Sequence, residues 1–230
     1  MIKYADDTVI LGMIENDDNT EYLSCIEFAN NWCEANFLDL NVQKTKEVIW
    51  DFRTNSVMKD AVRINGMEVE ITSMYKYLGL ILDNQLSFKD HVESQLKKSR
   101  KRMYCIRCLK NIRVEPEIIA HFYNATIPPT LMYASSSFYG LLTKYLNNDL
   151  NRPHTICHRM LGSVSNLVCN DEVYERKMKS LTSKILKCDD HPLSSYFVLM
   201  PSGRRYRLPS VRTNRFKFSF VPCAIRLLND

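Results

Sequence analysis

The pattern of apolar and polar positions predicts strands at the start of the chain and a helix after them. Two short apolar runs within Ile2 to Leu11 flank Ala5-Asp6-Asp7, which is typical of two strands joined by a tight turn. From Asn19 to Asn36 the apolar side chains recur at helical spacing, at Tyr22, Ile26, Ala29 and Cys33. This second stretch is therefore expected to form one helix.

More strands are predicted between this helix and residue 88. Glu47 to Phe52 and Tyr75 to Leu82 are strand candidates, and Val62 to Ile64 and Met67 to Ile71 flank Asn65-Gly66. An Asn-Gly pair is a strong signal for a two-residue hairpin turn, because both of its residues tolerate a positive φ. The first 88 residues are thus expected to combine a helix with a small antiparallel sheet.

The pattern becomes helical from Lys89. Lys89 to Asn111 keeps one apolar stripe while basic residues fill its other faces, and the stripe consists of Val92, Leu96, Met103 and Ile106. Pro116 suits the first turn of a second helix. Pro128-Pro129 is expected to end that helix, since proline lacks a backbone donor. Its inward side chains are expected to be Ile119, Phe122, Tyr123 and Thr126.

Further helices are predicted at Leu131 to Leu142 and at Thr143 to Leu161, the second with a break or kink at Pro153. After Gly162 the periodicity weakens, and only a short helix near Asp171 to Leu186 is expected. We therefore predict an α+β chain with three regions. These are a mixed α and β region over 1–88, a helical region over 89–165 and an irregular basic C-terminal region over 166–230.

Charge and composition limit the class of protein. The first 50 residues hold three Lys and ten Asp or Glu, whereas the rest holds 28 basic and 16 acidic residues. This asymmetry indicates an acidic site at one end and a surface for a polyanion at the other, or else a set of solvated faces. Eight scattered cysteines and the absence of a secretory signal predict an intracellular protein of the nucleus or cytoplasm. No run approaches the roughly 20 apolar residues of a membrane span.

Two adjacent carboxylates at the first predicted turn are the sharpest chemical feature. Asp6 and Asp7 repel each other, and Asn or Gly would form a turn without that repulsion. A divalent cation would relieve the repulsion, because Mg²⁺ binds one or two carboxylates and completes its shell with water and phosphate. Such ions can stabilise the attacking and leaving oxygens of phosphoryl transfer. The alternative is an ordinary exposed turn.

Several segments, in order, resemble one family. Lys3 to Leu11 resembles the catalytic hairpin of reverse transcriptases, and Leu40 to Lys46 is similar to the next palm motif of the non-LTR enzymes. Tyr75 to Gly79 resembles the turn that grips the primer strand, and the basic helical segment after it lies where the family has its thumb. Arg212 to Phe220 and Ala224 to Asn229 resemble the end of the reading frame in non-LTR (LINE-type) retrotransposons. The resemblance covers nearly the whole chain. It implies that residues 1–88 form an incomplete palm and that residues 89–165 form a thumb-like domain.

The resemblance implies roles for individual residues. Asp6 would be the principal ligand of Mg²⁺, with Asp7 as a second carboxylate beside it. Lys44 would protonate the departing pyrophosphate, or it is a solvated surface lysine. The primer-grip-like turn would consist of Tyr77, Leu78 and Gly79. Its glycine would let the backbone approach nucleic acid closely, unless the segment is a buried strand with a bulge.

Positive charge is concentrated in two segments. Nine basic and two acidic residues lie between Lys89 and Arg113, and phosphate contact requires such charge without any sequence code. Contacts with a template–primer duplex are expected from Lys97, Lys98, Arg100, Lys101, Arg102, Arg107, Lys110 and Arg113. The alternative is a solvated helix face. A second cluster contains Arg204, Arg205, Arg207, Arg212, Arg215 and Lys217, with three aromatic residues that could stack on bases or pack internally: Tyr206, Phe216 and Phe218.

Cysteine and histidine residues offer a weaker pattern. Cys105 and Cys108 fall in the basic helical segment, where their spacing places two thiols on one helix face. Zinc ligands could come from Cys157, His158, Cys169, Cys188 and His191, but these spacings fit no regular zinc module. Ordinary core and surface roles are therefore favoured.

The implied function is that of a fragment of an RNA-directed DNA polymerase, a nucleotidyltransferase. In the family a further metal-binding Asp and the nucleotide-binding fingers precede the hairpin, whereas three residues precede Tyr4, so the chain is expected to be inactive alone. Its partner would be an RNA or DNA template–primer duplex, with no membrane and no small-molecule cofactor beyond nucleotides. The alternative is a non-catalytic nucleic-acid-binding protein that uses only the basic helical region.

A second resemblance involves Tyr75 to about Tyr139. This segment is similar to a helical module catalogued with AlkB-type dioxygenases. An iron/2-oxoglutarate site needs a His followed two residues later by Asp, and a later His. None of the five histidines is followed by Asp at that distance, so the segment is interpreted as part of the thumb.

Overall fold

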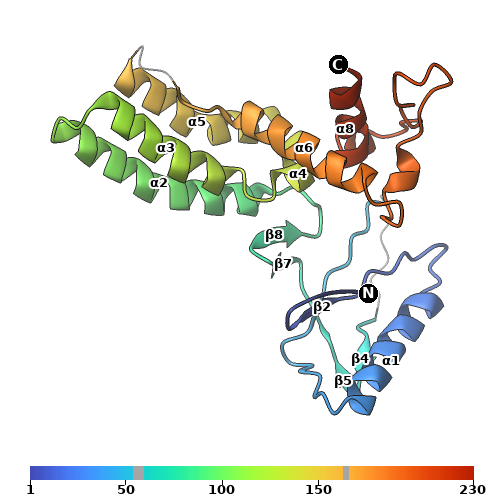
Figure 1. Ribbon diagram of the computed structural model, residues 1–230. Coiled ribbons are helices and arrows are strands. Elements are labelled where there is room, and N and C mark those ends of the chain that lie inside the picture. The colour runs from blue at the N-terminus through green and yellow to red at the C-terminus, as the bar shows by residue number, and fades with distance from the viewer. Residues whose placement is uncertain (54–59, 163–165) are drawn as a thin grey trace. The chain divides into compact units, whose positions relative to one another are not determined.

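The computed structural model describes residues 1–53, 60–162 and 166–230, and they form two compact units (Figure 1). Unit 1 comprises Met1–Lys76 and Asp83–Leu86, and unit 2 comprises Tyr77–Leu82 and Ser87–Asp230. The boundary that the sequence analysis puts at residue 165 lies outside the described residues. Residues 166–230 belong to the same unit as the helices that precede them.

Unit 1 begins with the predicted hairpin, in which β1 (Ile2–Tyr4) pairs antiparallel with β2 (Asp7–Val9). Tyr4 lies opposite Asp7, so the connecting loop contains two residues. The predicted helix follows as α1 (Thr20–Ala35). Both predictions are confirmed.

The Asn-Gly hairpin is also confirmed. β4 (Arg63–Ile64) pairs antiparallel with β5 (Met67–Glu68), and the two turn residues have positive φ, 52° at Asn65 and 77° at Gly66. Two successive left-handed residues match the twist of the flanking strands, which is why this turn needs such residue types.

One strand pair of unit 1 differs from the prediction. β3 (Lys46–Glu47) pairs in parallel with β6 (Glu70–Ile71), so the strand expected from Glu47 to Phe52 ends at its first residue. The expectation of a small antiparallel sheet is wrong in this respect, because the strands of the described residues form four separate pairs and this one is parallel. A parallel pair joins segments that are distant in sequence, and no local pattern reveals it.

The core of unit 1 is small. Its buried side chains are Ile26, Val42, Val62, Ile64 and Val69, with Ile10, Tyr22 and Leu40 packed against them. The cluster connects α1 and the β4–β5 hairpin with the segment that follows β2. Large apolar side chains elsewhere in this unit stay exposed, among them Phe28, Trp32 and Phe37. Hydrophobic burial therefore stabilises this unit only modestly.

The predicted strand over Tyr75 to Leu82 is a hairpin. β7 (Met74–Tyr77) and β8 (Leu80–Asp83) are paired, and the turn between them consists of Leu78 and Gly79. Both turn residues have positive φ, 46° and 87° respectively. The turn itself belongs to unit 2.

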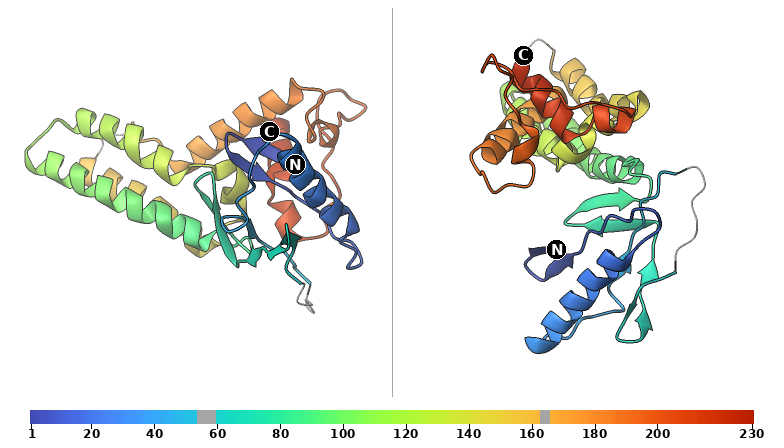
Figure 2. Two further views of the ribbon diagram at one scale, coloured as in Figure 1. Left: turned by 90° about the horizontal axis from the view of Figure 1, so that it is seen from below. Right: turned by 90° about the vertical axis from the view of Figure 1, so that its right-hand side faces the viewer.

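Three long helices form one end of unit 2 (Figure 1). α2 (Lys89–Asn111), α3 (Pro116–Leu131) and α5 (Lys144–Leu161) pack against one another, and Figure 2 shows α2 and α3 side by side. α2 has the predicted bounds. Its predicted stripe faces the core, with Val92, Met103 and Ile106 buried and Leu96 half-buried.

The helix end expected at Pro128-Pro129 is wrong, and the second helix is not broken at Pro153. α3 continues through Pro128 and Pro129 to Leu131, and α5 continues through Pro153. Each proline removes one backbone N–H donor from its helix. Pro128 and Pro153 are buried, and the burial of their rings offsets part of that cost.

The C-terminal part contains more regular structure than predicted. The helix expected over 131–142 is divided into α4 (Ser135–Phe138) and η1 (Tyr139–Leu141). After it come α6 (Asn170–Leu186), η2 (Ser194–Tyr196), α7 (Asn214–Lys217) and α8 (Phe220–Asn229). Only α6 was predicted, so the expectation of an irregular region over 166–230 is wrong.

α8 is ordered because it packs on α6. The cluster between them consists of Met178, Ile185, Phe197, Val221, Ala224 and Ile225. Apolar residues at helical spacing within α8 are the sequence signal for this packing. No helix within residues 1–53, 60–162 and 166–230 is long and apolar enough to cross a membrane.

Candidate functional site

The two predicted metal-binding carboxylates lie at the exposed tip of the β1–β2 hairpin. Ala5 and Asp6 form the two-residue loop, and Asp7 is the first residue of β2. All three side chains are exposed. Ala5 has a φ of 50°, a left-handed conformation that costs roughly 1–2 kcal/mol in a residue with a Cβ atom. Backbone strain of this kind is concentrated at functional sites.

Two contacts fix the hairpin within unit 1. The Lys3 ammonium lies over the ring of Trp32 in α1, 5.3 Å from its centroid. Ile10, which follows β2, packs on the cluster that includes Val42, and the exposed Lys44 lies two residues further along the chain. The predicted carboxylates and the predicted general acid are thus carried by segments that share one core. No hydrogen bond or ion pair joins Lys44 to either carboxylate in the described part of the chain.

The donor set of the hairpin fits part of a magnesium site. Carboxylate oxygens are the ligands that Mg²⁺ prefers, and an exposed tip leaves room for the water and phosphate oxygens that complete its shell. Among the described residues, no group of three or more His, Cys, Asp or Glu side chains could hold a metal ion. The hairpin therefore offers two adjacent carboxylates, from Asp6 and Asp7.

The predicted primer-grip-like turn is an exposed hairpin turn rather than a buried strand. Tyr77 is half-buried and Leu78 is 38% exposed. The hydroxyl of Tyr133 donates a hydrogen bond of 2.6 Å to the carbonyl oxygen of Leu78. A Cβ atom at Gly79 would lie 3.4 Å from the Tyr133 ring, an ordinary contact distance, so it is the positive φ of this position that favours glycine.

Most of the predicted basic residues of the α2 segment are exposed. These are Lys97, Lys98, Arg100, Lys101, Arg107, Lys110 and Arg113. Arg102 differs, because it is half-buried and its Nη1 donates a 3.0 Å hydrogen bond to the carbonyl of Thr126. The Nζ of Lys110 donates to the carbonyl of Met160 at 2.7 Å. Within the part of the chain that the structure describes, none of these eight cations forms an ion pair.

Three of these cations form the centre of the solvent-facing side of α2. Lys97, Arg100 and Lys101 follow the i, i+3, i+4 spacing that places side chains on one face of a helix. The buried residues Val92 and Met103 lie on the opposite face. These three cations form no ion pair with an acidic side chain of the described residues, and positive charge of this kind is what a phosphate backbone requires of its partner.

The C-terminal basic cluster has a different arrangement. Tyr206 packs against the α6–α8 cluster with its ring at right angles to Phe197, at a centroid distance of 6.2 Å. Its backbone exchanges two hydrogen bonds with the side chain of Asn229. Tyr206 therefore packs internally, whereas Phe218 is 43% exposed and lies beneath the ammonium of Lys217. The exposed basic residues of this cluster are Arg204, Arg205, Arg207, Arg212, Arg215 and Lys217.

The cysteine residues are all free thiols. Cys157 is buried in α5, and burial raises the pKa of its thiol to about 11, which keeps it protonated and unreactive at neutral pH. Cys105 and Cys188 are exposed.

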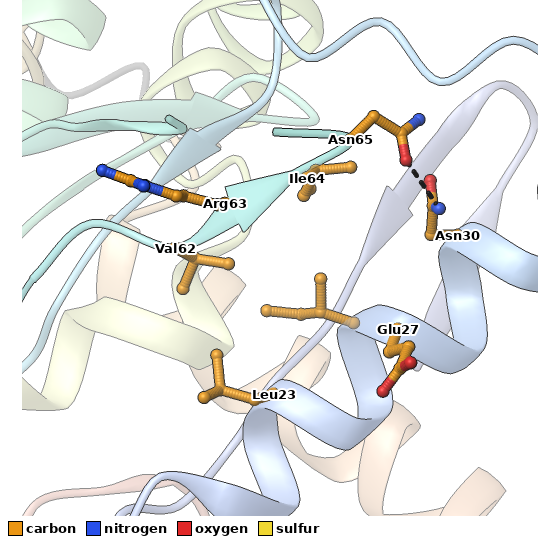
Figure 3. Close-up of a pocket in the computed structure, with 8 residues that line it drawn as sticks. Leu23, Glu27, Asn30, Val62, Arg63, Ile64 and Asn65 are labelled. Atoms are coloured by element: carbon orange, nitrogen blue, oxygen red, sulfur yellow. Dashed lines mark hydrogen bonds between the residues drawn. The ribbon is translucent and has the colours of Figure 1, made fainter. Parts of the chain in front are cut away.

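A separate cleft of about 290 Å³ opens in unit 1 between α1 and β4 (Figure 3). It is lined by Leu23, Ile26, Glu27, Asn30, Val62, Arg63, Ile64 and Asn65. The Asn30 side chain donates a 2.9 Å hydrogen bond to the Oδ1 of Asn65, shown as a dashed line in Figure 3. None of the predicted site residues lines this cleft.

Curated proteins similar to this chain are polymerases of mobile elements. The chain is 27% identical over 232 residues to the RNA-directed DNA polymerase from mobile element jockey of Drosophila funebris, covering 92% of this chain and 24% of that protein. It is 27% identical to the polymerase of the same name from Drosophila melanogaster, and 24% identical to the probable RNA-directed DNA polymerase from transposon BS of that species. Each of these two alignments covers 70% of this chain and 18% of the relative. By name, all three relatives are RNA-directed DNA polymerases.

The chain spans about a fifth to a quarter of the length of the curated relatives that it matches. No family model and no solved structure matches it. The names of the relatives agree with the resemblance to reverse transcriptases, and none of them points to an AlkB-type dioxygenase.

Sequence reasoning missed two residues beside the primer-grip-like turn. Tyr133 donates to the carbonyl of Leu78, and His91, which is buried in α2, accepts a 3.4 Å hydrogen bond from the amide of Ile81. Tyr133 and Leu78 are 55 positions apart in the chain, so no local pattern could pair them. The one sequence signal for His91 is its place next to Val92, the first residue of the apolar stripe of α2.

Proposed function

We propose that this chain is part of an RNA-directed DNA polymerase, the reverse transcriptase of a non-LTR retrotransposon. In this proposal unit 1 is a portion of the palm and unit 2 contains the thumb. Support comes from the order of the motifs along the chain and from relatives of that name, whose alignments cover 70–92% of it. The exposed basic face of α2 is the structural observation that carries the nucleic-acid part of the proposal.

The β1–β2 hairpin would serve as the metal-binding element. Asp6 and Asp7 would hold Mg²⁺, which when bound neutralises charge on the oxygens of phosphoryl transfer. Lys44 would deliver a proton to the departing pyrophosphate. The strained, exposed loop at Ala5 supports this assignment, because it presents both carboxylates to solvent at the cost of local backbone energy.

The basic face of α2 would bind the template–primer duplex through its phosphates. Each cation that neutralises a phosphate releases condensed counterions, so affinity falls as salt concentration rises. Lys97, Arg100 and Lys101 are the best probes of this face, since all three are exposed. Arg102 is a poor probe, because its hydrogen bond to the Thr126 carbonyl gives it a structural role in holding α2 to α3.

The test is a titration of the purified chain with a primer–template duplex between about 50 and 200 mM salt. We expect the triple variant Lys97→Ala, Arg100→Ala, Lys101→Ala to bind more weakly and to reduce the salt slope by about 1 for each lost phosphate contact. The matched control removes the same charge from exposed positions of α6, with Arg176→Ala, Lys179→Ala and Lys184→Ala. Equal slopes for the two variants would refute the assignment of α2 as the duplex-binding element. Salt-insensitive binding by the unmodified chain would refute the nucleic-acid function itself.

A further inference from the structure

The turn formed by Leu78 and Gly79 is held by hydrogen bonds on both sides. Before the glycine, the carbonyl oxygen of Leu78 accepts the 2.6 Å bond from the Tyr133 hydroxyl. After it, the amide of Ile81 donates to the Nδ1 of His91 at 3.4 Å. The Tyr133 ring also covers the position where a side chain at residue 79 would lie.

His91 is held in place by its own packing. The ring of His91 is 1% exposed and packs edge-on against Phe138, with the ring centroids 4.9 Å apart. Because Nδ1 accepts from the amide of Ile81, the proton of the neutral ring belongs on Nε2. The Nε2 of His91 lies 3.4 Å from the side-chain nitrogen of Gln95. The two hydrogen bonds on the turn thus form a small network around it, in which Tyr133 binds Leu78 and His91 binds Ile81.

Such a network is needed because the turn is strained. Leu78 has a φ of 46°, and a residue with a Cβ atom adopts this conformation only when its surroundings hold it there. Leu78 is also partly exposed, so hydrophobic burial alone does not fix it. The hydroxyl of Tyr133 and the imidazole of His91 supply directional bonds in place of that burial.

We propose that Tyr133 and His91 are positioning residues, which hold the Tyr77–Gly79 turn in the conformation that contacts the primer strand. The primer-strand role rests on the proposed function, whereas the holding of the turn does not. Neither residue needs to touch nucleic acid. Their effect would pass through the backbone of Leu78 and Ile81.

The first experiment compares amide hydrogen exchange of residues 78–82 in the unmodified chain and in Tyr133→Phe. This variant keeps the ring against Gly79 and removes only the hydroxyl donor. We expect exchange in this segment to accelerate about fivefold, the change that corresponds to the loss of one ordinary hydrogen bond. Tyr145→Phe is the matched control, because its ring is 71% exposed on α5. Equal exchange in the Tyr133→Phe variant and the unmodified chain would overturn the proposal.

The second experiment tests His91 by conservative rescue. In His91→Asn the side-chain oxygen can still accept a hydrogen bond close to the position of Nδ1, whereas in His91→Leu no acceptor remains. We expect the Leu variant to show faster exchange at residues 78–82 and the Asn variant to recover most of the protection. Thermal melting followed by circular dichroism identifies a variant that has lost its fold. In that case the exchange rates of Tyr133→Phe decide whether such hydrogen bonds hold the turn. Protection that survives in a folded His91→Leu variant would contradict the role of His91.

The third experiment separates this inference from the proposed function. Tyr133→Phe removes no charge, so we expect it to weaken binding of the primer–template duplex about fivefold while leaving the salt slope unchanged. The Lys97, Arg100 and Lys101 variant changes the slope instead. Unaltered affinity in Tyr133→Phe, with faster exchange in the turn, would overturn the primer-strand role. If the unmodified chain binds no duplex, the proposed function fails, and the exchange data still decide whether Tyr133 and His91 hold the turn.

Discussion

At the scale of single residues, Ala5 is one of several residues with a Cβ atom whose backbone has a positive φ. Its φ of 50° is one that glycine adopts freely. We expect Ala5→Gly to relieve roughly 1–2 kcal/mol of strain and to lose about 0.5–1 kcal/mol through the greater freedom of the unfolded chain. The variant should therefore be as stable as the unmodified chain, or about 1 kcal/mol more stable, in urea unfolding.

The matched control for this prediction is Ala125→Gly. Ala125 is exposed in the middle of α3, where glycine costs about 1 kcal/mol relative to alanine. The same chemical change should thus have opposite effects at the two positions. Two variants with equal losses of stability would show that Ala5 is not strained.

His91 gives a prediction about pH. Burial is the main cause that lowers the pKa of His91 below its ordinary value of about 6.5, with Lys98 adding to it and a hydrogen bond to the backbone of Tyr133 opposing it. The unfolded chain then binds a proton that the folded chain does not bind. The stability contributed by neutral His91 is complete above pH 6.5 or so and is lost as the pH falls below that value.

We expect the free energy of unfolding to decrease between about pH 6.5 and pH 5, and His91→Asn to flatten this decrease. Burial also lowers the pKa of His154, so His154→Gln should remove a second part of the dependence. His121 is exposed, and His121→Gln is the control. The measurement is urea unfolding at several pH values. An unchanged pH profile in His91→Asn would contradict the assigned cause.

At the scale of elements, the last turn of α3 contains two prolines that differ in their surroundings. Pro128 is buried, whereas Pro129 is exposed in the same helix. Pro129→Ala restores a backbone donor for the carbonyl of Ala125 and removes no buried ring, so we expect a gain of roughly 1–3 kcal/mol. Pro128→Ala restores a donor as well but loses buried apolar surface, and its gain should be smaller. Thermal unfolding of the two variants ranks them, and a larger gain at Pro128 would contradict this account.

The elements that the sequence predicts well are those whose signals are local. The turn at Asn65-Gly66 follows from the conformational preferences of its two residues alone. The apolar stripe of α2 predicts both ends of that helix. The elements that it predicts poorly depend on partners elsewhere. β3 ends early because its partner is the distant β6, and α3 passes Pro128 because the helix buries that ring. α8 is not among the predicted elements, although its apolar residues recur at helical spacing.

At the scale of the whole chain, local patterns predict the segments of the candidate site but not the contacts that support them. The Asp6–Asp7 turn, the Tyr77–Gly79 turn and the basic face of α2 are each contiguous in sequence, and each could be predicted as a segment. What could not be predicted is what supports them. Arg102 bonds to α3 and so differs from its neighbours in the basic segment. Tyr133 and His91 are joined to the turn through backbone atoms, which leave no signature in residue types.

The last prediction concerns polymerisation by the chain alone. Its hairpin offers two adjacent carboxylates, and no described residues form a larger group of potential metal ligands. Mg²⁺ requires near-octahedral geometry, and a two-metal reaction must hold both the attacking and the leaving oxygen. The alignments also cover only 18–24% of the relatives, so most of the length of those polymerases lies outside the aligned part. We therefore expect the purified chain to bind a primer–template duplex but to add no nucleotides at any Mg²⁺ concentration.

The assay is primer extension by the unmodified chain beside Asp6→Asn, with duplex binding measured in parallel. Asp6→Asn should leave binding unchanged or slightly stronger, because it removes negative charge near a polyanion. Binding by both proteins without extension is the result we expect from a portion of a polymerase, and a non-catalytic binding protein would give it too. The two differ when the unaligned part of a relative is added as a separate chain. Extension that then appears with the unmodified chain and not with Asp6→Asn requires the carboxylate. Extension by the unmodified chain alone, abolished in Asp6→Asn, would show that two carboxylates on this hairpin suffice and that the chain is a polymerase in its own right.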